Sequence, residues 1–199
     1  AMLARRPALS CFNAVYRYSQ VAGARLFTLW ATCRRELELA CALAPLLWVS
    51  LDHLWFPDAI ATDASSEGLG VVALEADPDD LADAAAEPVH MPADDVPPAR
   101  APEPHSSLRP ILAARGRVLV SSRWRDPEHI NILELRAVQT ALRWATSRPA
   151  GVDCRLLLLV DSSVSVYALN KGRSSSRPML RRLRAIAALV LASGLRVFT

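Results

Sequence analysis

The chain of 199 residues is long enough for one domain with an additional segment, and 52% of its residues are hydrophobic, which supports a sizeable core. Its longest apolar stretches, around residues 40–49 and 185–192, are too short to span a bilayer, and we find no secretory signal pattern. The four cysteines form no CxxC pair, and no histidine lies at zinc-ligand spacing. We therefore expect a reduced protein inside the cell, in the cytoplasm or the nucleus, that is not secreted and has no membrane partner.

The net charge of +3 conceals an uneven distribution. Residues 77–95 contain no Lys or Arg but carry the acidic residues Asp77, Asp79, Asp80, Asp83, Glu87, Asp94 and Asp95. After Asp161 the pattern reverses, with no acidic residue and the basic residues Lys171, Arg173, Arg177, Arg181, Arg182, Arg184 and Arg196. A block of one sign favours a polyanionic partner, although a solvated helix face explains the charge equally well.

Residues 1–56 are predicted to be mostly helical, because apolar residues recur at intervals of three and four between Leu26 and Ala44. Pro45 is expected to end or kink that helix. Residues 46–56 are apolar and rich in Trp, so we expect them to pack on the domain that follows. The segment has no chemical signature, which indicates a structural role.

The next part of the chain predicts an antiparallel hairpin, with strands over 59–64 and 70–74 and turn residues at 65–68. Residues 77–110 hold more than half of the fourteen prolines together with many Asp and Ala. This composition predicts a disordered or loosely packed insertion. A third strand is expected over 117–124.

The last third alternates between helical and extended patterns. It predicts a helix over 131–147, a buried strand over 155–160, a short helix ending near Asn170, a helix between Pro178 and Gly194, and a strand over 195–198. The first of these helices forms a crossover, and a right-handed crossover lays strand 155–160 parallel to strand 59–64. The expected fold class is therefore α/β.

Three carboxylates, Asp63, Glu134 and Asp161, stand at boundaries of these elements. Both aspartates follow the expected parallel strands, at the sheet edge where open α/β sheets place their sites. Each carboxylate also has an ordinary explanation: a turn aspartate at 63, a capping box of Asn131 with Glu134, and a helix cap at 161. Glu134, however, shares its helix face with Val138, and a buried glutamate is costly unless it is paired or bound to a metal.

Convergence of the three carboxylates would require compensating charge. Two like charges about 4 Å apart repel by roughly 4 kcal/mol at an effective dielectric constant of about 20. Oxygen ligands alone suit Mg²⁺ or Mn²⁺ rather than Zn²⁺. Two such ions about 3.5–4 Å apart promote phosphodiester hydrolysis, and the basic block after Asp161 could hold the phosphates of the substrate.

These residues resemble the ribonuclease H domain of reverse transcriptases, especially those of retrotransposons of the DIRS type that encode a tyrosine recombinase. The resemblance covers residues 57–199, and residues 1–56 are similar, more weakly, to the linker that joins the polymerase thumb to this domain. Three motifs carry it in the order and spacing of the family: Thr62-Asp63-Ala64-Ser65 with Gly68 and Gly70, His129-Ile130-Asn131 with Leu133-Glu134-Leu135 and Ala137, and Val160-Asp161-Ser162 with Asn170-Lys171-Gly172.

The resemblance implies an RNase H-like fold with a five-stranded mixed sheet, preceded by a helical segment. It implies a divalent-metal-dependent endonuclease that hydrolyses the RNA strand of RNA–DNA hybrids with two Mg²⁺ or Mn²⁺ ions and needs no small-molecule cofactor. Its partners would be the hybrid and the polymerase domain of the same polyprotein. Carried over by motif, the metal ligands are Asp63, Glu134 and Asp161, and the residues expected to contact substrate are Ser65, Asn131, Lys171 and Arg173.

Two departures from the family leave other functions open. Ser162 stands where the family commonly has Asn, and the family's fourth acidic residue and a nearby His follow the fifth strand, after Thr199, so we expect this chain to be truncated at its C-terminus. One alternative is a catalytically incomplete RNase H-like scaffold or connection module that positions nucleic acid or packs on the polymerase. Another is a different nuclease or a transposase on the same fold.

Overall fold

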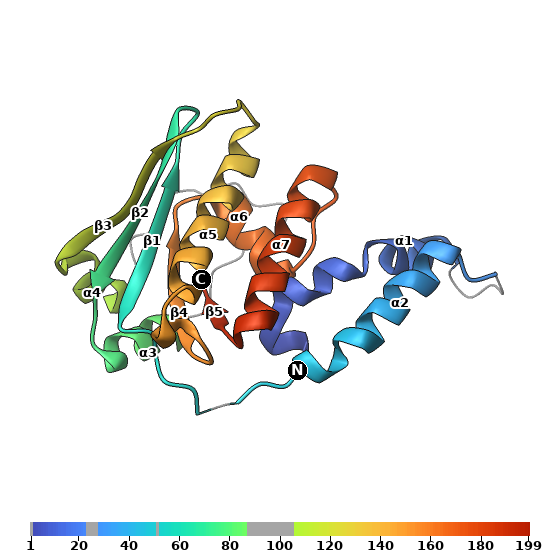
Figure 1. The fold of residues 1–199 in the computed structure, drawn as a ribbon, viewed down its shortest axis with the longest axis horizontal. Helices are drawn as coiled ribbons and strands as arrows, with labels where there is room; N and C mark the ends of the chain where they lie inside the picture. The colour runs from blue at the N-terminus through green and yellow to red at the C-terminus, as the bar shows by residue number, and fades with distance from the viewer. Residues whose placement is uncertain (1, 23–27, 51, 87–105) are drawn as a thin grey trace.

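The computed structural model describes residues 2–22, 28–50, 52–86 and 106–199. The chain forms an α/β fold in which helices flank a five-stranded mixed sheet and a helical segment precedes the sheet (Figure 1). The preceding segment comprises η1 (Met2–Cys11), α1 (Asn13–Ala22), α2 (Ala31–Leu43) and η2 (Ala44–Leu46). The strands are β1 (Asp58–Ala64), β2 (Gly68–Glu75), β3 (Gly116–Arg123), β4 (Arg155–Val160) and β5 (Arg196–Phe198). The remaining helices are α3 (Pro78–Ala86), η3 (Ser106–Leu108), α4 (Arg109–Ala113), α5 (Ile130–Thr146), η4 (Pro149–Gly151), α6 (Ser163–Lys171) and α7 (Arg177–Ser193).

The strands lie in the order β3-β2-β1-β4-β5. β1 pairs antiparallel with β2, and β2 pairs antiparallel with β3, so the predicted hairpin and third strand are confirmed. β4 pairs parallel with both β1 and β5. The predicted crossover through α5 is therefore confirmed, and it places the carboxyl ends of β1 and β4 side by side.

The main core lies between the sheet and the pair α5 and α7. The predicted apolar faces of both helices are buried, with Val138, Ala141 and Ala145 of α5 and Leu183 and Val190 of α7 in this core. Leu180 and Ala187 of α7 are buried outside it. Burying one leucine side chain of this kind stabilises a fold by about 1.5–3 kcal/mol. As predicted, Pro178 lies in the first turn of α7 and Gly194 ends it in the left-handed conformation, with φ 70°.

A smaller core covers the opposite face of the sheet, where α3 and α4 lie (Figure 1). Leu81 of α3 and Ile111 of α4 are fully buried against Ala59 and Leu157 of the sheet. The prediction of a disordered or loosely packed insertion over 77–110 is therefore wrong for these two helices. The apolar side chains in this acidic, Pro-rich segment suffice to cover the sheet, and Pro78 and two acidic residues open α3 favourably. The rest of the insertion, residues 87–105, lies outside the described residues.

The N-terminal segment packs on α6 and α7 through its first helical turns. Arg184 of α7 donates a hydrogen bond from Nε to the carbonyl oxygen of Ser10 (3.1 Å), and its Nη2 lies 3.5 Å from Oε1 of Glu36. Glu36 also accepts hydrogen bonds from the backbone N–H groups of Ala14 and Val15, which begin α1. The predicted helical character of this segment is confirmed in its described residues, and α2 ends two residues before Pro45.

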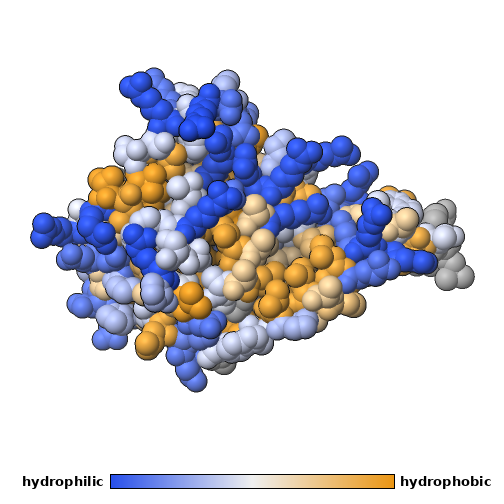
Figure 2. All heavy atoms as spheres, in the orientation of Figure 1, coloured by the Kyte–Doolittle hydropathy of each residue, from blue (hydrophilic) through white to orange (hydrophobic). Residues whose placement is uncertain are grey.

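Apolar side chains of this segment are distributed between the core and the surface. Phe56 is buried in the main core, whereas Leu54 is 83% exposed and Trp48 is 58% exposed. The prediction that residues 46–56 pack on the next domain therefore holds for only part of the stretch. Figure 2 shows hydrophobic atoms gathered where the N-terminal segment meets the sheet domain. Among the described residues, no helix combines the length and the apolar character that a bilayer crossing requires.

Candidate metal centre

Asp63 and Asp161 lie at the carboxyl ends of two adjacent parallel strands. Thr62 of β1 pairs with Val160 of β4, and the next residue on each strand path is an aspartate. Both aspartates are exposed to solvent. Asp161 does not cap α6, because the N-cap is Ser162, whose Oγ accepts a hydrogen bond from the backbone N–H of Ser165 at 3.3 Å. The ordinary explanation of Asp161 as a helix cap therefore does not apply.

Glu134 lies one turn into α5, with only 8% of its surface exposed. Its Oε2 is buried and has no hydrogen-bond partner among the described residues. Burial raises the pKa of this carboxyl above its ordinary value, and the negative charges of Asp63 and then Asp161 raise it further. Asp63 and Asp161 therefore lie close enough to Glu134 to affect its carboxyl electrostatically.

The capping box predicted from Asn131 and Glu134 is wrong. The N-cap of α5 is His129, whose Nδ1 accepts a hydrogen bond from the backbone N–H of Asn131 at 3.3 Å. The helix begins before Asn131 because the histidine ring replaces the expected side chain as the capping acceptor. Glu134 consequently has no capping role, and its burial is left without a structural explanation.

Two hydroxyl oxygens on the neighbouring elements are also buried without a partner in the described part of the chain. They are Oγ1 of Thr62, which precedes Asp63 on β1, and Oγ of Ser165 in the first turn of α6. A buried hydroxyl normally has a hydrogen-bond partner. Hydrogen bonds within the described residues do not account for these two hydroxyls, and the candidate metal centre depends on the carboxylate oxygens, which Mg²⁺ and Mn²⁺ prefer.

The carboxylates do not surround one point in this conformation. Within the described residues, no group of three or more His, Cys, Asp or Glu side chains is arranged to hold a metal ion. The three side chains differ in burial: Glu134 is buried, whereas Asp63 and Asp161 are exposed. The donor set nevertheless fits a divalent cation chemically, because all three side chains offer carboxylate oxygens.

An open cleft of about 420 Å³ lies beside Asp63. Asp63 pairs with Gly70 of β2, where an added Cβ would meet no atom within 4 Å, so the glycine leaves the space next to the carboxylate free. Sequence reasoning missed the opposite wall of the cleft, which β3 supplies. That wall consists of Ser121, Ser122 and Arg123. The only signal for it in the sequence was the change from apolar to polar residues at the end of the predicted strand.

Ser65, predicted to contact substrate, lines this cleft together with Asp63. Its Oγ accepts hydrogen bonds from the backbone N–H groups of Glu67 and Gly68, each at 3.2 Å. Its carbonyl oxygen accepts a hydrogen bond from Nε1 of Trp124 at 2.9 Å. These contacts hold the turn between β1 and β2 in place, so Ser65 has a fixed position at the edge of the cleft.

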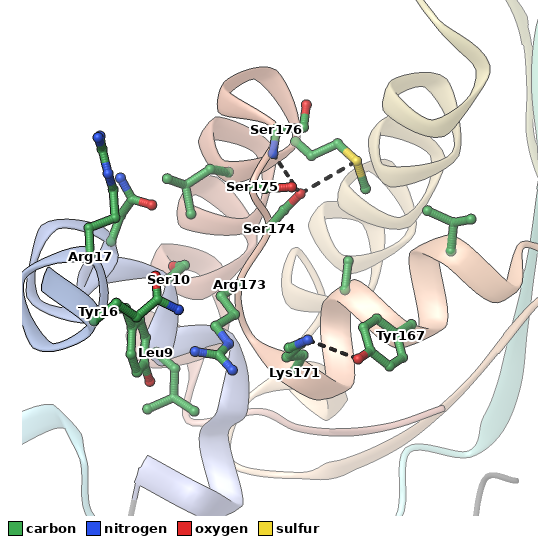
Figure 3. Close-up of a pocket in the computed structure, with 16 residues that line it drawn as sticks. Leu9, Ser10, Tyr16, Arg17, Tyr167, Lys171, Arg173, Ser174, Ser175 and Ser176 are labelled. Atoms are coloured by element: carbon green, nitrogen blue, oxygen red, sulfur yellow. Dashed lines mark hydrogen bonds between the residues drawn. The ribbon is translucent and has the colours of Figure 1, made fainter. Parts of the chain in front are cut away.

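The other predicted substrate residues do not line the cleft beside Asp63. Asn131 is half-buried in the first turn of α5, one turn before Glu134. Lys171 and Arg173 line a different pocket, between the N-terminal segment and α6–α7, as Figure 3 shows. The structure therefore brings Ser65 to Asp63 but separates the two basic residues from this cleft.

Comparison of the chain with protein-family models, with curated proteins and with solved structures gave no match.

Proposed function

We propose that the chain is an RNase H-like domain of a DIRS-type retroelement reverse transcriptase, and that it hydrolyses the RNA strand of RNA–DNA hybrids using two Mg²⁺ or Mn²⁺ ions. The observation that carries the proposal is the carboxyl of Glu134: its Oε2 is buried without a hydrogen-bond partner among the described residues, and burial, then Asp63 and Asp161, raise its pKa. The strand order and directions support the proposal, because an RNase H-like fold has a five-stranded mixed sheet. In the parent protein, the polymerase domain of the same polyprotein would be the partner.

In this proposal Asp63, Glu134 and Asp161 hold the ions. When bound, a pair of divalent ions activates water and stabilises the leaving oxygen of a phosphodiester. Glu134 is the buried ligand of the centre, and Asp63 and Asp161 are its two solvent-exposed ligands. Substrate would approach from the exposed side. The cleft over Gly70 would accommodate the sugar–phosphate backbone, with Ser65 on one side and Arg123 on the other.

A catalytically incomplete RNase H-like module is the second candidate. The observation that favours it is that the described residues hold no closed group of metal ligands. Such a module would position nucleic acid or pack on the polymerase without cleaving the hybrid. The two candidates differ in whether the three carboxylates bind a divalent ion at all.

Calorimetric titration with Mn²⁺ tests the proposal. We expect the unchanged chain to bind Mn²⁺, and Asp63→Asn and Asp161→Asn to lose that binding, because each substitution removes one negative ligand. Asp126→Asn is the matched control, since Asp126 is exposed and lies outside the cleft. It should bind as the unchanged chain does. Equal Mn²⁺ binding by all four proteins would refute the metal centre, and a chain that binds Mn²⁺ but never cuts a labelled hybrid would favour the incomplete module.

A further inference from the structure

A second cavity, of about 520 Å³, lies between the N-terminal segment and the sheet domain (Figure 3). Its walls come from η1 and α1 on one side and from α6, the following loop and the start of α7 on the other. Three basic residues, Arg17, Lys171 and Arg173, line it together with the consecutive serines 174–176. Among the residues that the structure describes, none of those lining it is acidic. The cavity therefore offers positive charge and hydroxyl groups to an anionic ligand.

Two of the three basic side chains of this cavity, those of Lys171 and Arg173, lie against aromatic rings. The guanidinium carbon of Arg173 lies 4.5 Å from the centre of the Tyr16 ring, and Nζ of Lys171 lies 4.7 Å from the centre of the Tyr167 ring. Lys171 also donates a hydrogen bond to the hydroxyl of Tyr167 at 2.8 Å. A cation stacked on a ring keeps its full charge for a ligand, whereas an ion pair would neutralise it.

The N-terminal end of α7 adds to the positive electrostatic potential of the cavity. α7 is a helix of 17 residues, and its N-cap, Ser176, makes no side-chain capping hydrogen bond. Backbone N–H groups in the first turn of a helix attract anions, and the helix dipole adds to this effect. Ser174, Ser175 and Ser176 line the cavity at this end of the helix. The helix terminus, the basic side chains and the hydroxyls therefore favour a ligand of the same sign.

α6 connects this cavity to the candidate metal centre. The helix begins two residues after Asp161, and its residues Val164, Tyr167 and Lys171 line the cavity along one face. Nine helical residues rise about 13 Å, which corresponds to roughly four nucleotides at about 3.4 Å per nucleotide along one strand. A single nucleic-acid strand is therefore long enough to reach from one site to the other.

We propose that this cavity binds the sugar–phosphate backbone of a nucleic-acid strand, and that the N-terminal segment contributes directly through Tyr16 and Arg17. The choice of nucleic acid as ligand rests on the proposed function. Alternating cations and aromatic rings are typical of surfaces that bind strands, and the cavity is larger than one phosphate ion requires. The N-terminal segment is then part of the binding surface as well as a structural linker.

Fluorescence anisotropy with a labelled RNA–DNA hybrid in EDTA tests this inference without any cleavage. We expect Arg17→Glu to weaken binding at least fivefold. The slope of log K against the logarithm of the salt concentration should become less steep by about the amount that one phosphate contact contributes. Arg34→Glu is the matched control, because Arg34 is also an exposed arginine of the N-terminal segment but lies outside the cavity. It should bind within twofold of the unchanged chain. Arg173→Glu provides a second variant from the opposite wall, with an expected loss as large as that of Arg17→Glu.

An equal loss of hybrid affinity in Arg17→Glu and Arg34→Glu would overturn the inference, because the change in net charge alone would then explain the loss. The absence of any loss in Arg17→Glu, or of any hybrid binding by the unchanged chain, would do the same. Inorganic phosphate at millimolar concentration is added as a competitor, and complete displacement of the hybrid would identify a phosphate-ion site instead. The anisotropy assay in EDTA contains no divalent ion and the Mn²⁺ titration contains no hybrid, so failure of the metal centre and failure of this cavity give separate results.

Discussion

Asp63 of β1 lies directly opposite Gly70 of β2, and a side chain at position 70 would project into open space beside the carboxylate. Gly68, two residues earlier, has the opposite environment: an added Cβ would lie 2.5 Å from the carbonyl oxygen of Ser122. The two positions of β2 therefore hold glycine for different reasons. One permits close packing of β2 on β3, and the other leaves the cleft open.

We expect Gly68→Ala to lower the free energy of unfolding by about 2 kcal/mol, since a backbone atom must move to admit the methyl group. Gly70→Ala should change it by no more than about 0.5 kcal/mol, because the methyl group meets no atom. Urea unfolding measures both values. Equal losses in the two variants would contradict the packing described for β2 and β3.

A larger side chain at position 70 tests the cleft rather than the fold. Gly70→Phe should leave the protein folded and reduce cleavage of a labelled hybrid at least tenfold, because the ring would fill the space next to Asp63. Gly70→Ala serves as its control and should retain most of the activity. Full activity of Gly70→Phe would show that substrate does not enter through this cleft.

Glu134→Gln should stabilise the metal-free protein by about 1 kcal/mol at pH 7.5, because it removes a buried charge that two aspartates repel. Since the folded state raises the pKa of Glu134, it favours the protonated carboxyl, and ionisation destabilises the fold as the pH rises through that pKa. The two proteins should therefore be equally stable near pH 4 and should diverge towards neutral pH. Thermal melts between pH 4 and pH 7.5 measure the difference in stability between the two proteins. A Glu134→Gln variant that is less stable than the unchanged chain at pH 7.5 would contradict the prediction.

The same substitution should reverse the order of stability when a divalent ion is present. Mg²⁺ or Mn²⁺ would raise the melting temperature of the unchanged chain by binding the folded state. Glu134→Gln should gain little, because one ligand has lost its charge. If both proteins gained equally from the ion, Glu134 would not belong to the metal centre.

Cysteine reactivity tests the described packing independently of function. Cys41 is exposed, whereas Cys154 is 4% exposed, and burial, with a smaller effect of Asp153, raises the pKa of its thiol to about 11. At pH 8 very little of Cys154 is thiolate, so iodoacetamide should modify Cys41 at least ten times faster. Mass spectrometry of timed samples measures the ratio. Comparable rates would mean that the core around β4 is open.

Gly172→Ala tests the junction between the N-terminal segment and the sheet domain. Gly172 has φ 64°, and an added Cβ would lie 1.9 Å from the carbonyl oxygen of Arg6. We expect a loss of about 2 kcal/mol or more in the free energy of unfolding. Hydrogen exchange in η1 should accelerate as well, because the segment can no longer approach α6. Gly194→Ala is the control: its φ of 70° implies similar backbone strain, but its neighbour is Asp153, so exchange in η1 should not change.

Much of the fold follows from local patterns in the sequence. The strands of the hairpin, β4 and α7 were predicted within one or two residues, because short apolar stretches and the helix-end residues Pro178 and Gly194 act over short distances. The cap of α5 was misplaced because a histidine ring, rather than Asn131, accepts the hydrogen bond. Leu81 and Ile111 were missed because only the tertiary contact with β1 and β4 makes them core residues.

The candidate site was predicted in part for the same reason. Parallel pairing of β1 and β4 follows from a general rule of connection, so Asp63 and Asp161 could be placed together before the fold was known. The positions of Lys171 and Arg173 could not be predicted in this way, because the cavity that they line depends on where the N-terminal segment docks on α6 and α7. No local pattern encodes that docking.

The contact between Gly172 and the carbonyl oxygen of Arg6 also fixes the separation of the two walls of the basic cavity. That separation depends on backbone packing, which varies less than side-chain rotamers do. A ligand that enters need not draw the walls together, so little conformational entropy is lost when it binds. We therefore expect strands to associate with the cavity without a slow closing step, and its selectivity to depend on the width of the ligand.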